Sequence, residues 1–267
     1  MVSADLSDPT SAREAARGAA VLYQALNPPY HRWQQLFPAL QHAALAAAQA
    51  GNARYVSIEN LYMYEPSKPI SEDSAAAPQS KKGMLRQRMA EEVMELHTKG
   101  ELRATALRAS DYYGPGVEGS VLGELTFGRL VSGKKPQILG SAEMPHSFAY
   151  IEDVGQAAAV LGTSDLVLGR VWIAPHAPAR TQREMVEAAG RALGSQVRPS
   201  VISPFMVRLA GLFVPTARAS AEMIYQFTAP FVVDSSRIER ELGLSATPIE
   251  VGIERTVAWY RERNGRK

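Results

Sequence analysis

Residues 104–116 read ATALRASDYYGPG, a short apolar run that passes directly into a turn. The run from Ala104 to Arg108 has the length and apolar content of a strand that is buried on both faces. Gly114, Pro115 and Gly116 supply the turn chemistry that ends such a strand. The stretch therefore predicts one central strand of a parallel sheet.

Three other segments repeat this pattern, at residues 19–23, 54–58 and 170–174. Amphipathic stripes occupy two of the gaps: Leu36, Leu40, Ala43, Ala44 and Ala47 form the first, and Leu85, Met89, Val93 and Leu96 form the second. Short strands that alternate with helices are typical of a parallel sheet with crossover helices. We therefore expect an α/β fold, with a sheet domain over residues 1–174.

The last third of the chain shows helical patterns instead, and we expect a small, mostly helical C-terminal domain over residues 175–267. Two capping boxes are predicted there, Thr181-x-x-Glu184 and Ser236-x-x-Glu239. The segments 204–213 and 217–227 carry many large apolar residues for their length. Such residues suit a cap over a substrate cleft or a contact between subunits, and the sequence favours neither.

The composition narrows the classes of partner. The 267 residues contain no cysteine, which excludes disulfides and thiolate catalysis and fits a reducing cytoplasm. The 29 Lys and Arg nearly balance the 27 Asp and Glu, and no basic run exceeds a pair, so no nucleic-acid partner is expected. No stretch approaches the roughly 18 apolar residues of a spanning helix, so no membrane partner is expected. Five scattered histidines lack ligand spacing, so no metal site is expected.

Six segments, in order along nearly the whole chain, carry motifs. They are Asp5-Leu-Ser-Asp8, Gln24-Ala-Leu-Asn-Pro-Pro-Tyr30, Tyr55-Val-Ser-Ile-Glu-Asn-Leu-Tyr-Met-Tyr64, Arg108-Ala-Ser-Asp-Tyr-Tyr-Gly-Pro-Gly116, His146-Ser-Phe-Ala-Tyr-Ile-Glu-Asp-Val154 and Phe231-Val-Val-Asp-Ser-Ser-Arg237. Together they resemble the extended short-chain dehydrogenase/reductase family, the NAD-dependent epimerase/dehydratase group. The resemblance implies a Rossmann-like, doubly wound parallel sheet that binds NAD or NADP at the carboxyl ends of its strands.

The resemblance also implies roles for single residues. The implied cofactor contacts are Asp5, Leu6, Ala25, Leu26, Asn27 and Ser110, with Asp5 facing the adenine. The implied substrate contacts are Tyr64, Asp111, Tyr113 and His146. When the chain is aligned through Tyr64, the family's catalytic Ser, Tyr and Lys fall on Asn60, Lys82 and Arg86.

The sequence departs from the family at the cofactor site, because it contains no Gly-x-x-Gly-x-x-Gly turn. If Asp5 ends the family's third strand, the first two β-α units have no counterpart here and the Rossmann-like sheet is partial. A start placed too far downstream, a deliberately shortened chain, and a naturally short chain completed by a homodimer all agree with this pattern. NAD or NADP binding is then expected to be weakened or absent.

The catalytic set departs as well, because Lys82 and Arg86 stand where the family has a phenol and an amine. Residues four apart share one helix face, so both cations can point into a cleft. Lys82 can then act as an acid/base or form an imine, or both cations can clamp a phosphate or carboxylate. A solvated helix face is the third interpretation.

These expectations combine into two hypotheses of different class. The first is an NAD(P)-dependent oxidoreductase of the epimerase/dehydratase type, acting on a small polar or nucleotide-sugar-like substrate. Asn60 would orient this substrate, Lys82 would donate a proton or act as an electrophile, and Arg86 would clamp charge. The alternative is a non-catalytic binding or regulatory protein that kept the fold, since a fold can be retained when the catalytic activity is lost.

Overall fold

The computed structural model describes residues 3–66 and 68–265, and the chain divides into two compact, interleaved units. Unit 1 comprises Met1–Glu65, Ser74–Ala109 and Gln156–Ile173, and unit 2 comprises Pro66–Asp73, Ser110–Gly155 and Ala174–Lys267. The sequence-based division at residue 174 differs from this, because residues 110–155 group with the C-terminal part of the chain.

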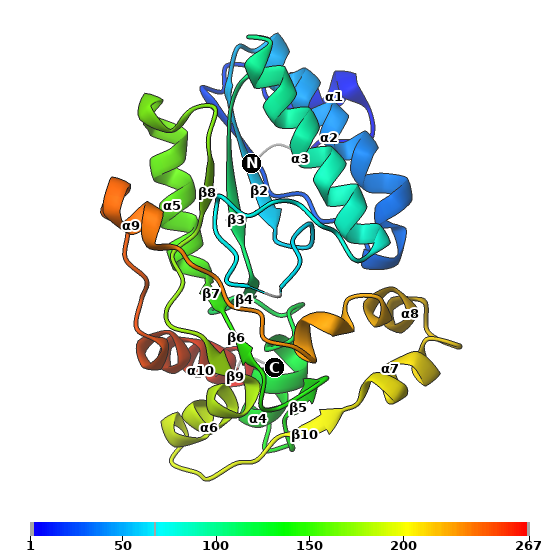
Figure 1. Cartoon of the computed structure of the whole chain (residues 1–267), viewed down its shortest axis with the longest axis vertical. Helices are drawn as coiled ribbons and strands as arrows, with labels where there is room; N and C mark the ends of the chain where they lie inside the picture. The colour runs from blue at the N-terminus through cyan, green and yellow to red at the C-terminus, as the bar shows by residue number, and fades with distance from the viewer. Residues whose placement is uncertain (1–2, 67, 266–267) are drawn as a thin grey trace. The chain divides into compact units, whose positions relative to one another are not determined.

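Unit 1 is built on a parallel four-stranded sheet with the order β1-β2-β3-β8 (Figure 1). Its strands are β1 (Val21–Gln24), β2 (Arg54–Asn60), β3 (Arg103–Ala109) and β8 (Val171–Ile173). Its helices are α1 (Pro9–Ala15), η1 (Tyr30–Arg32), α2 (Trp33–Ala50), α3 (Lys81–Thr98), η3 (Asp165–Val167) and the later part of α5 (Ile151–Thr163). All four strands expected from the sequence are confirmed, with small shifts at their ends.

Helices cover both faces of this sheet, with α2 and α3 on one side and α5 on the other (Figure 1). On the first face, Tyr55 of β2 and Ala104 of β3 are buried together with Val93 of α3. On the second face, Tyr23 of β1 lies so close to Gly162 of α5 that a Cβ atom at Gly162 would overlap the tyrosine ring. The expectation of a Rossmann-like, doubly wound α/β sheet is therefore confirmed.

A charged network crosses the centre of the sheet, inside the stretch that predicts the fold. Arg108 of β3 is paired in register with Glu59 of β2. Its Nε donates to Glu59 Oε2 at 2.8 Å, and its Nη1 contacts the Tyr64 hydroxyl. Ser57 Oγ donates to the other carboxylate oxygen at 2.8 Å. Because the Glu59 side chain is 1% exposed and that of Arg108 is 9% exposed, each charge depends on its partner.

Unit 2 consists mainly of helices with three short two-stranded ladders. Its helices are η2 (Gly123–Gly128), α4 (Arg129–Val131), α6 (Gln182–Ala192), α7 (Pro204–Ala210), α8 (Pro215–Ala221), η4 (Ile224–Phe227), α9 (Ser236–Leu242) and α10 (Ile249–Gly265). Its ladders pair β4 (Asp111–Tyr113) with β7 (Phe148–Tyr150), β5 (Gln137–Leu139) with β10 (Ser200–Ile202), and β6 (Pro145–His146) with β9 (Arg180–Thr181). β4 and β7 pair with each other rather than with the large sheet, which explains why residues 110–155 leave unit 1.

One of the two predicted capping boxes is present. Thr181 Oγ1 accepts the Glu184 backbone N–H, and the Glu184 carboxylate accepts the Thr181 N–H. The prediction of a capping box at Ser236-x-x-Glu239 is wrong. Ser236 is the first residue inside α9, and it donates its N–H to the Asp234 carboxylate. In the part of the chain that the structure describes, no helix has the length and apolarity needed to cross a membrane.

Removing one partner of the Glu59–Arg108 pair leaves the other charge buried and unpaired. We expect Arg108→Met to lower the free energy of unfolding by about 3–5 kcal/mol, measured by urea titration. The double variant Glu59→Gln/Arg108→Met removes both charges and is expected to recover part of that loss. Arg103→Met, at an exposed arginine on the same strand, is the control and should cost less than about 1 kcal/mol. A double variant less stable than the single one would contradict this account.

Candidate functional site

The first turn of α3 packs directly on the segment that follows β2. Ser80 caps the helix by accepting the Gly83 N–H at 2.9 Å. A Cβ atom at Gly83 would lie 2.3 Å from the backbone oxygen of Tyr62, so only glycine permits this approach. The sequence Lys82-Gly83 thereby fixes Lys82 beside Tyr62.

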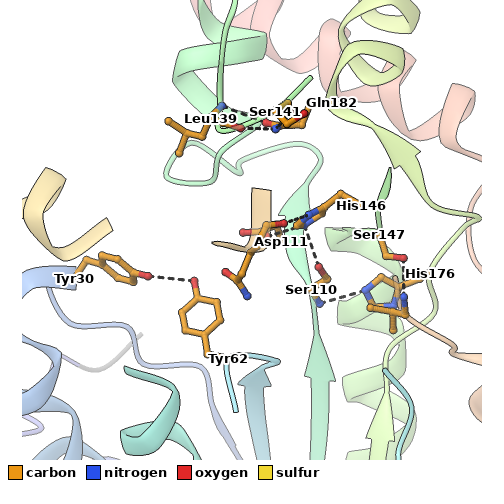
Figure 2. Close-up of polar contacts among 12 residues, drawn as sticks. Tyr30, Tyr62, Ser110, Asp111, Leu139, Ser141, His146, Ser147, His176 and Gln182 are labelled. Atoms are coloured by element: carbon orange, nitrogen blue, oxygen red, sulfur yellow. Dashed lines mark hydrogen bonds and ion pairs between the residues drawn. The ribbon is translucent and has the colours of Figure 1, made fainter. Parts of the chain in front are cut away.

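Lys82 is buried in an aromatic cluster, which we call the Lys82 cluster and which consists of Tyr30, Trp33, Tyr62 and Lys82. The lysine is 6% exposed, and its Nζ lies 4.5 Å from the centroid of the Tyr30 ring. The Tyr30 hydroxyl donates to the Tyr62 hydroxyl at 3.5 Å, and Figure 2 shows the two hydroxyls pointing toward one another. Trp33 stacks on Tyr62 and meets Tyr30 edge-on, which holds both phenols in place.

The loop between β1 and α2 positions the indole of this cluster. Trp33 Nε1 donates to the backbone oxygen of Pro28 at 3.0 Å and to Asn27 Oδ1 at 3.1 Å. Asn27, an implied cofactor contact, thus has a partner within the chain. Its neighbours Ala25 and Leu26 are exposed and half-buried, and their predicted contacts with a cofactor stay predictions.

Arg86 lies one helical turn beyond Lys82 and is 2% exposed. Its guanidinium lies 4.7 Å from the Phe37 ring, and its Nη2 donates to the backbone oxygen of Ile58 at 3.5 Å. The interpretation of these two cations as a solvated helix face is therefore wrong, because both are buried. Asn60, the third predicted catalytic residue, ends β2 and accepts the Tyr62 N–H through Oδ1 at 3.3 Å.

The remaining residues predicted for a cofactor or substrate in unit 1 lie apart from this cluster. Asp5 is exposed, and hydrogen bonds from the side chain and backbone of Ser7 lower the pKa of its carboxyl. Leu6 packs beside a buried group on α1 and α2. Tyr64 is 2% exposed and contacts Arg108, so it belongs to the charged network of the sheet.

The carboxyl end of β1 offers a test of whether a nicotinamide cofactor fits. Gln24 is 1% exposed, and neither its Nε2 nor its Oε1 has a hydrogen-bond partner among residues 3–66 and 68–265. A buried amide without partners has an unused donor and an unused acceptor, and a carboxamide or a ribose hydroxyl is chemically complementary to both. By contrast, none of the four strands of the unit 1 sheet runs through a glycine-rich turn into a helix. Gln24 is therefore complementary to the nicotinamide end of the cofactor. The four-stranded sheet offers no glycine-rich turn to bind the pyrophosphate.

Unit 2 holds a second polar group, where β4 begins. His146 Nε2 lies 2.9 Å from Asp111 Oδ2 and 3.4 Å from Ser110 Oγ, and its Nδ1 lies 3.2 Å from the backbone oxygen of Gln226 (Figure 2). Because a carbonyl can only accept, Nδ1 carries a hydrogen. The ring packs against three phenylalanines, Phe148, Phe227 and Phe231. The predicted residues Ser110, Asp111 and His146 thus do meet.

His176 joins this group, although no role was predicted for it from the sequence. Its Nδ1 donates to the Ala174 oxygen at 2.6 Å, and its Nε2 accepts the Ser110 N–H at 3.2 Å. Burial lowers the pKa of His176 to about 4, with a smaller contribution from nearby His146 and opposition from the Ala174 hydrogen bond. Its position directly after the fourth strand, where ligand-facing residues of such sheets gather, was the available signal.

Two further features complete unit 2. Tyr113, an implied substrate contact, is 2% exposed within the apolar core, and burial raises the pKa of its hydroxyl. A cavity of about 390 Å³ lies beside His176, and its polar lining includes Arg180, Ser235 and Glu250. Its lining residues all belong to unit 2.

Comparison with known proteins shows a shared fold. No protein-family model matches the chain, and no curated protein matches it. Among solved structures, a dTDP-glucose 4,6-dehydratase from Streptomyces venezuelae with NAD bound has a TM-score of 0.77 at 20% identity, covering 98% of this chain and 79% of its own. A UDP-glucuronic acid 4-epimerase from Bacillus cereus, in complex with UDP-glucuronic acid and NAD, has a TM-score of 0.76 at 17% identity, with coverages of 97% and 80%. RMD from Pseudomonas aeruginosa, complexed with NADPH, has a TM-score of 0.75 at 13% identity, with coverages of 98% and 87%.

The depressed pKa of His176 makes a prediction about stability. In the unfolded chain the imidazole titrates near 6.5, whereas in the folded chain it titrates at about 4, so the unfolded state binds more protons between these values. His176 therefore destabilises the fold as the pH falls from about 6.5 to about 4, by on the order of 3 kcal/mol. Replacing it with Gln keeps a donor and an acceptor but removes the titration. The difference in the free energy of unfolding between wild type and His176→Gln should change with pH across this window. If the free energies of unfolding of the two proteins instead follow parallel curves against pH, the prediction is wrong.

Proposed function

We propose that this chain is an NAD(P)-dependent oxidoreductase of the epimerase/dehydratase type, acting on a nucleotide-sugar-like substrate. The observation that carries the proposal is the burial of the Lys82 ammonium against the ring of Tyr30, whose hydroxyl is hydrogen-bonded to that of Tyr62. The shared fold with sugar-nucleotide dehydratases and epimerases supports the reaction class.

The burial of Lys82 argues against a purely structural role. Withdrawing an ammonium from water costs several kcal/mol unless the surroundings compensate for it. The Tyr30 ring returns about 1–2 kcal/mol as a cation–π contact. A buried cation within a group of titratable side chains is therefore a candidate for a functional site.

The chemistry of the cluster is proton transfer. In the family that the sequence resembles, a tyrosine with a lysine four residues later exchanges a proton with the substrate while hydride moves. Position 82 lacks the phenol, but η1 and the segment after β2 bring two phenols to the same place. In this proposal Lys82 and the hydrogen bond that Tyr30 donates stabilise Tyr62 as a phenolate, and the Tyr62 oxygen takes the proton of a substrate hydroxyl and becomes a neutral phenol.

The other residues hold ligands in place. Bound nicotinamide would supply the hydride acceptor, and the Gln24 amide would hold its carboxamide or ribose. Asn60 fixes the turn that aims Tyr62, through its hydrogen bond to the Tyr62 N–H. Arg86 acts as a positioning residue, because it contacts Phe37, which packs against Trp33 of the cluster, and the backbone oxygen of Ile58 in β2.

Conversion of UDP-glucuronic acid and of dTDP-glucose, in the presence of NAD and followed by NMR of the sugar, tests this proposal. Tyr62→Phe is expected to lower kcat by about 10²–10⁴-fold with a small change in KM, because it removes the proton acceptor. Lys82→Met should lower kcat as well, and Lys82→Arg should restore part of it by returning the charge.

Tyr23→Phe, which removes a phenol on β1 outside the cluster, is the control and should leave kcat unchanged. If Tyr62→Phe retains full kcat, the assignment of proton transfer is wrong. Saturable cofactor or sugar-nucleotide binding without turnover in the wild type would favour the non-catalytic alternative.

A further inference from the structure

The exposed apolar side chains of this protein gather in one place. Of the twelve large hydrophobic residues that are exposed in the described chain, seven lie between positions 201 and 214. They are Val201, Phe205, Met206, Leu209, Leu212, Phe213 and Val214. Phe213 is 82% exposed and Phe205 is 72% exposed. We call this surface, on β10, α7 and the turn before α8, the apolar hairpin.

The backbone holds these side chains outward. Ser203 Oγ accepts the Met206 N–H at the start of α7, and the Arg218 Nε of α8 donates to the Gly211 oxygen at 2.9 Å. A Cβ atom at Gly211 would lie 2.9 Å from the Arg218 Cα, so the two helices meet closely there. Val207 turns inward and joins the core of unit 2, and Ile202 packs against the same core. Figure 1 shows α7 and α8 extending away from α6 and α10.

The charge of this segment has one sign. Residues 188–221 contain four arginines, Arg191, Arg198, Arg208 and Arg218, and no aspartate or glutamate. Arg208 on α7 and Arg218 on α8 are both exposed and flank the apolar side chains. Over the whole chain the numbers of acidic and basic residues are nearly equal, 27 against 29. The apolar hairpin is therefore locally cationic on an almost neutral protein.

We propose that the apolar hairpin docks this protein on the surface of an anionic lipid bilayer. Exposed Phe and Leu with flanking arginines are what an interfacial segment needs, since the apolar groups enter the acyl boundary and the guanidinium groups pair with lipid phosphates. A second copy of the chain fits less well. A two-fold contact through this surface would bring Arg208 and Arg218 of both copies together without a carboxylate from the same segment.

This contact is peripheral, and it revises the sequence-based expectation of no membrane partner. That expectation considered only apolar stretches long enough to span a bilayer. An interfacial contact needs a few large apolar side chains on short helices, which the apolar hairpin supplies. The proposal is independent of the proposed enzymatic activity.

Vesicle flotation of the whole chain tests it. The probes are vesicles of phosphatidylcholine alone and of phosphatidylcholine with about 30% phosphatidylglycerol. We expect partitioning onto the anionic vesicles, weakened by about 0.5 M salt. Phe205→Ser/Phe213→Ser should lower the partition coefficient by roughly ten-fold or more, and Arg208→Gln should lower it by about five-fold.

Matched controls keep the test decisive. Leu166→Ser removes an apolar residue that is 83% exposed on η3, and Arg261→Gln removes an exposed arginine on α10; both should float like wild type. Thermal unfolding shows whether each variant is folded. The proposal is overturned if folded wild type does not bind anionic vesicles, or if the double Phe variant binds them equally well. Self-association abolished by that variant, without lipid binding, would assign the surface to a second copy.

Discussion

The close approach of α3 to the backbone of residue 62 is the constraint on which the candidate site depends. Gly83 permits it, Ser80 caps the turn that makes it, and Lys82 is thereby buried rather than solvated. Once the ammonium is buried, groups of the protein replace its water shell, and one of them is an aromatic ring. Tyr30, from a different part of the chain, contacts the ammonium through its ring and places its hydroxyl against that of Tyr62.

Much of the fold could be predicted from sequence, because periodicity reports which residues face a core. The four strands and the buried stripe Leu85, Met89 and Val93 are examples. The division into units could not be predicted, because it depends on the pairing of β4 with β7, 37 positions later in the chain, and no local sequence signal indicates that pairing. The capping box at Ser236 failed because Asp234 captures the N–H that starts the helix.

The site was predicted in part. The family resemblance placed Asn60, Lys82 and Arg86 in one region, and the helix period placed the two cations on one face. It missed Tyr30 and Trp33 as partners of Lys82, because residues 30, 62 and 82 meet only through tertiary packing. The run of Pro and aromatic residues before α2 was the one local hint. Gln24 and His176 were also missed, since a buried polar group looks the same as an exposed one in sequence.

The central claim is that Tyr30 and Tyr62 face the ligand at the Lys82 cluster. NMR of the protein labelled with ¹³C at the tyrosine ring, titrated with NADH and then with UDP-glucuronic acid, tests it most directly, with Tyr30→Phe and Tyr62→Phe assigning the two signals. The account predicts that these two signals shift saturably and that the signal of Tyr23 does not. Saturable binding that shifts other tyrosines while leaving Tyr30 and Tyr62 unchanged would contradict it.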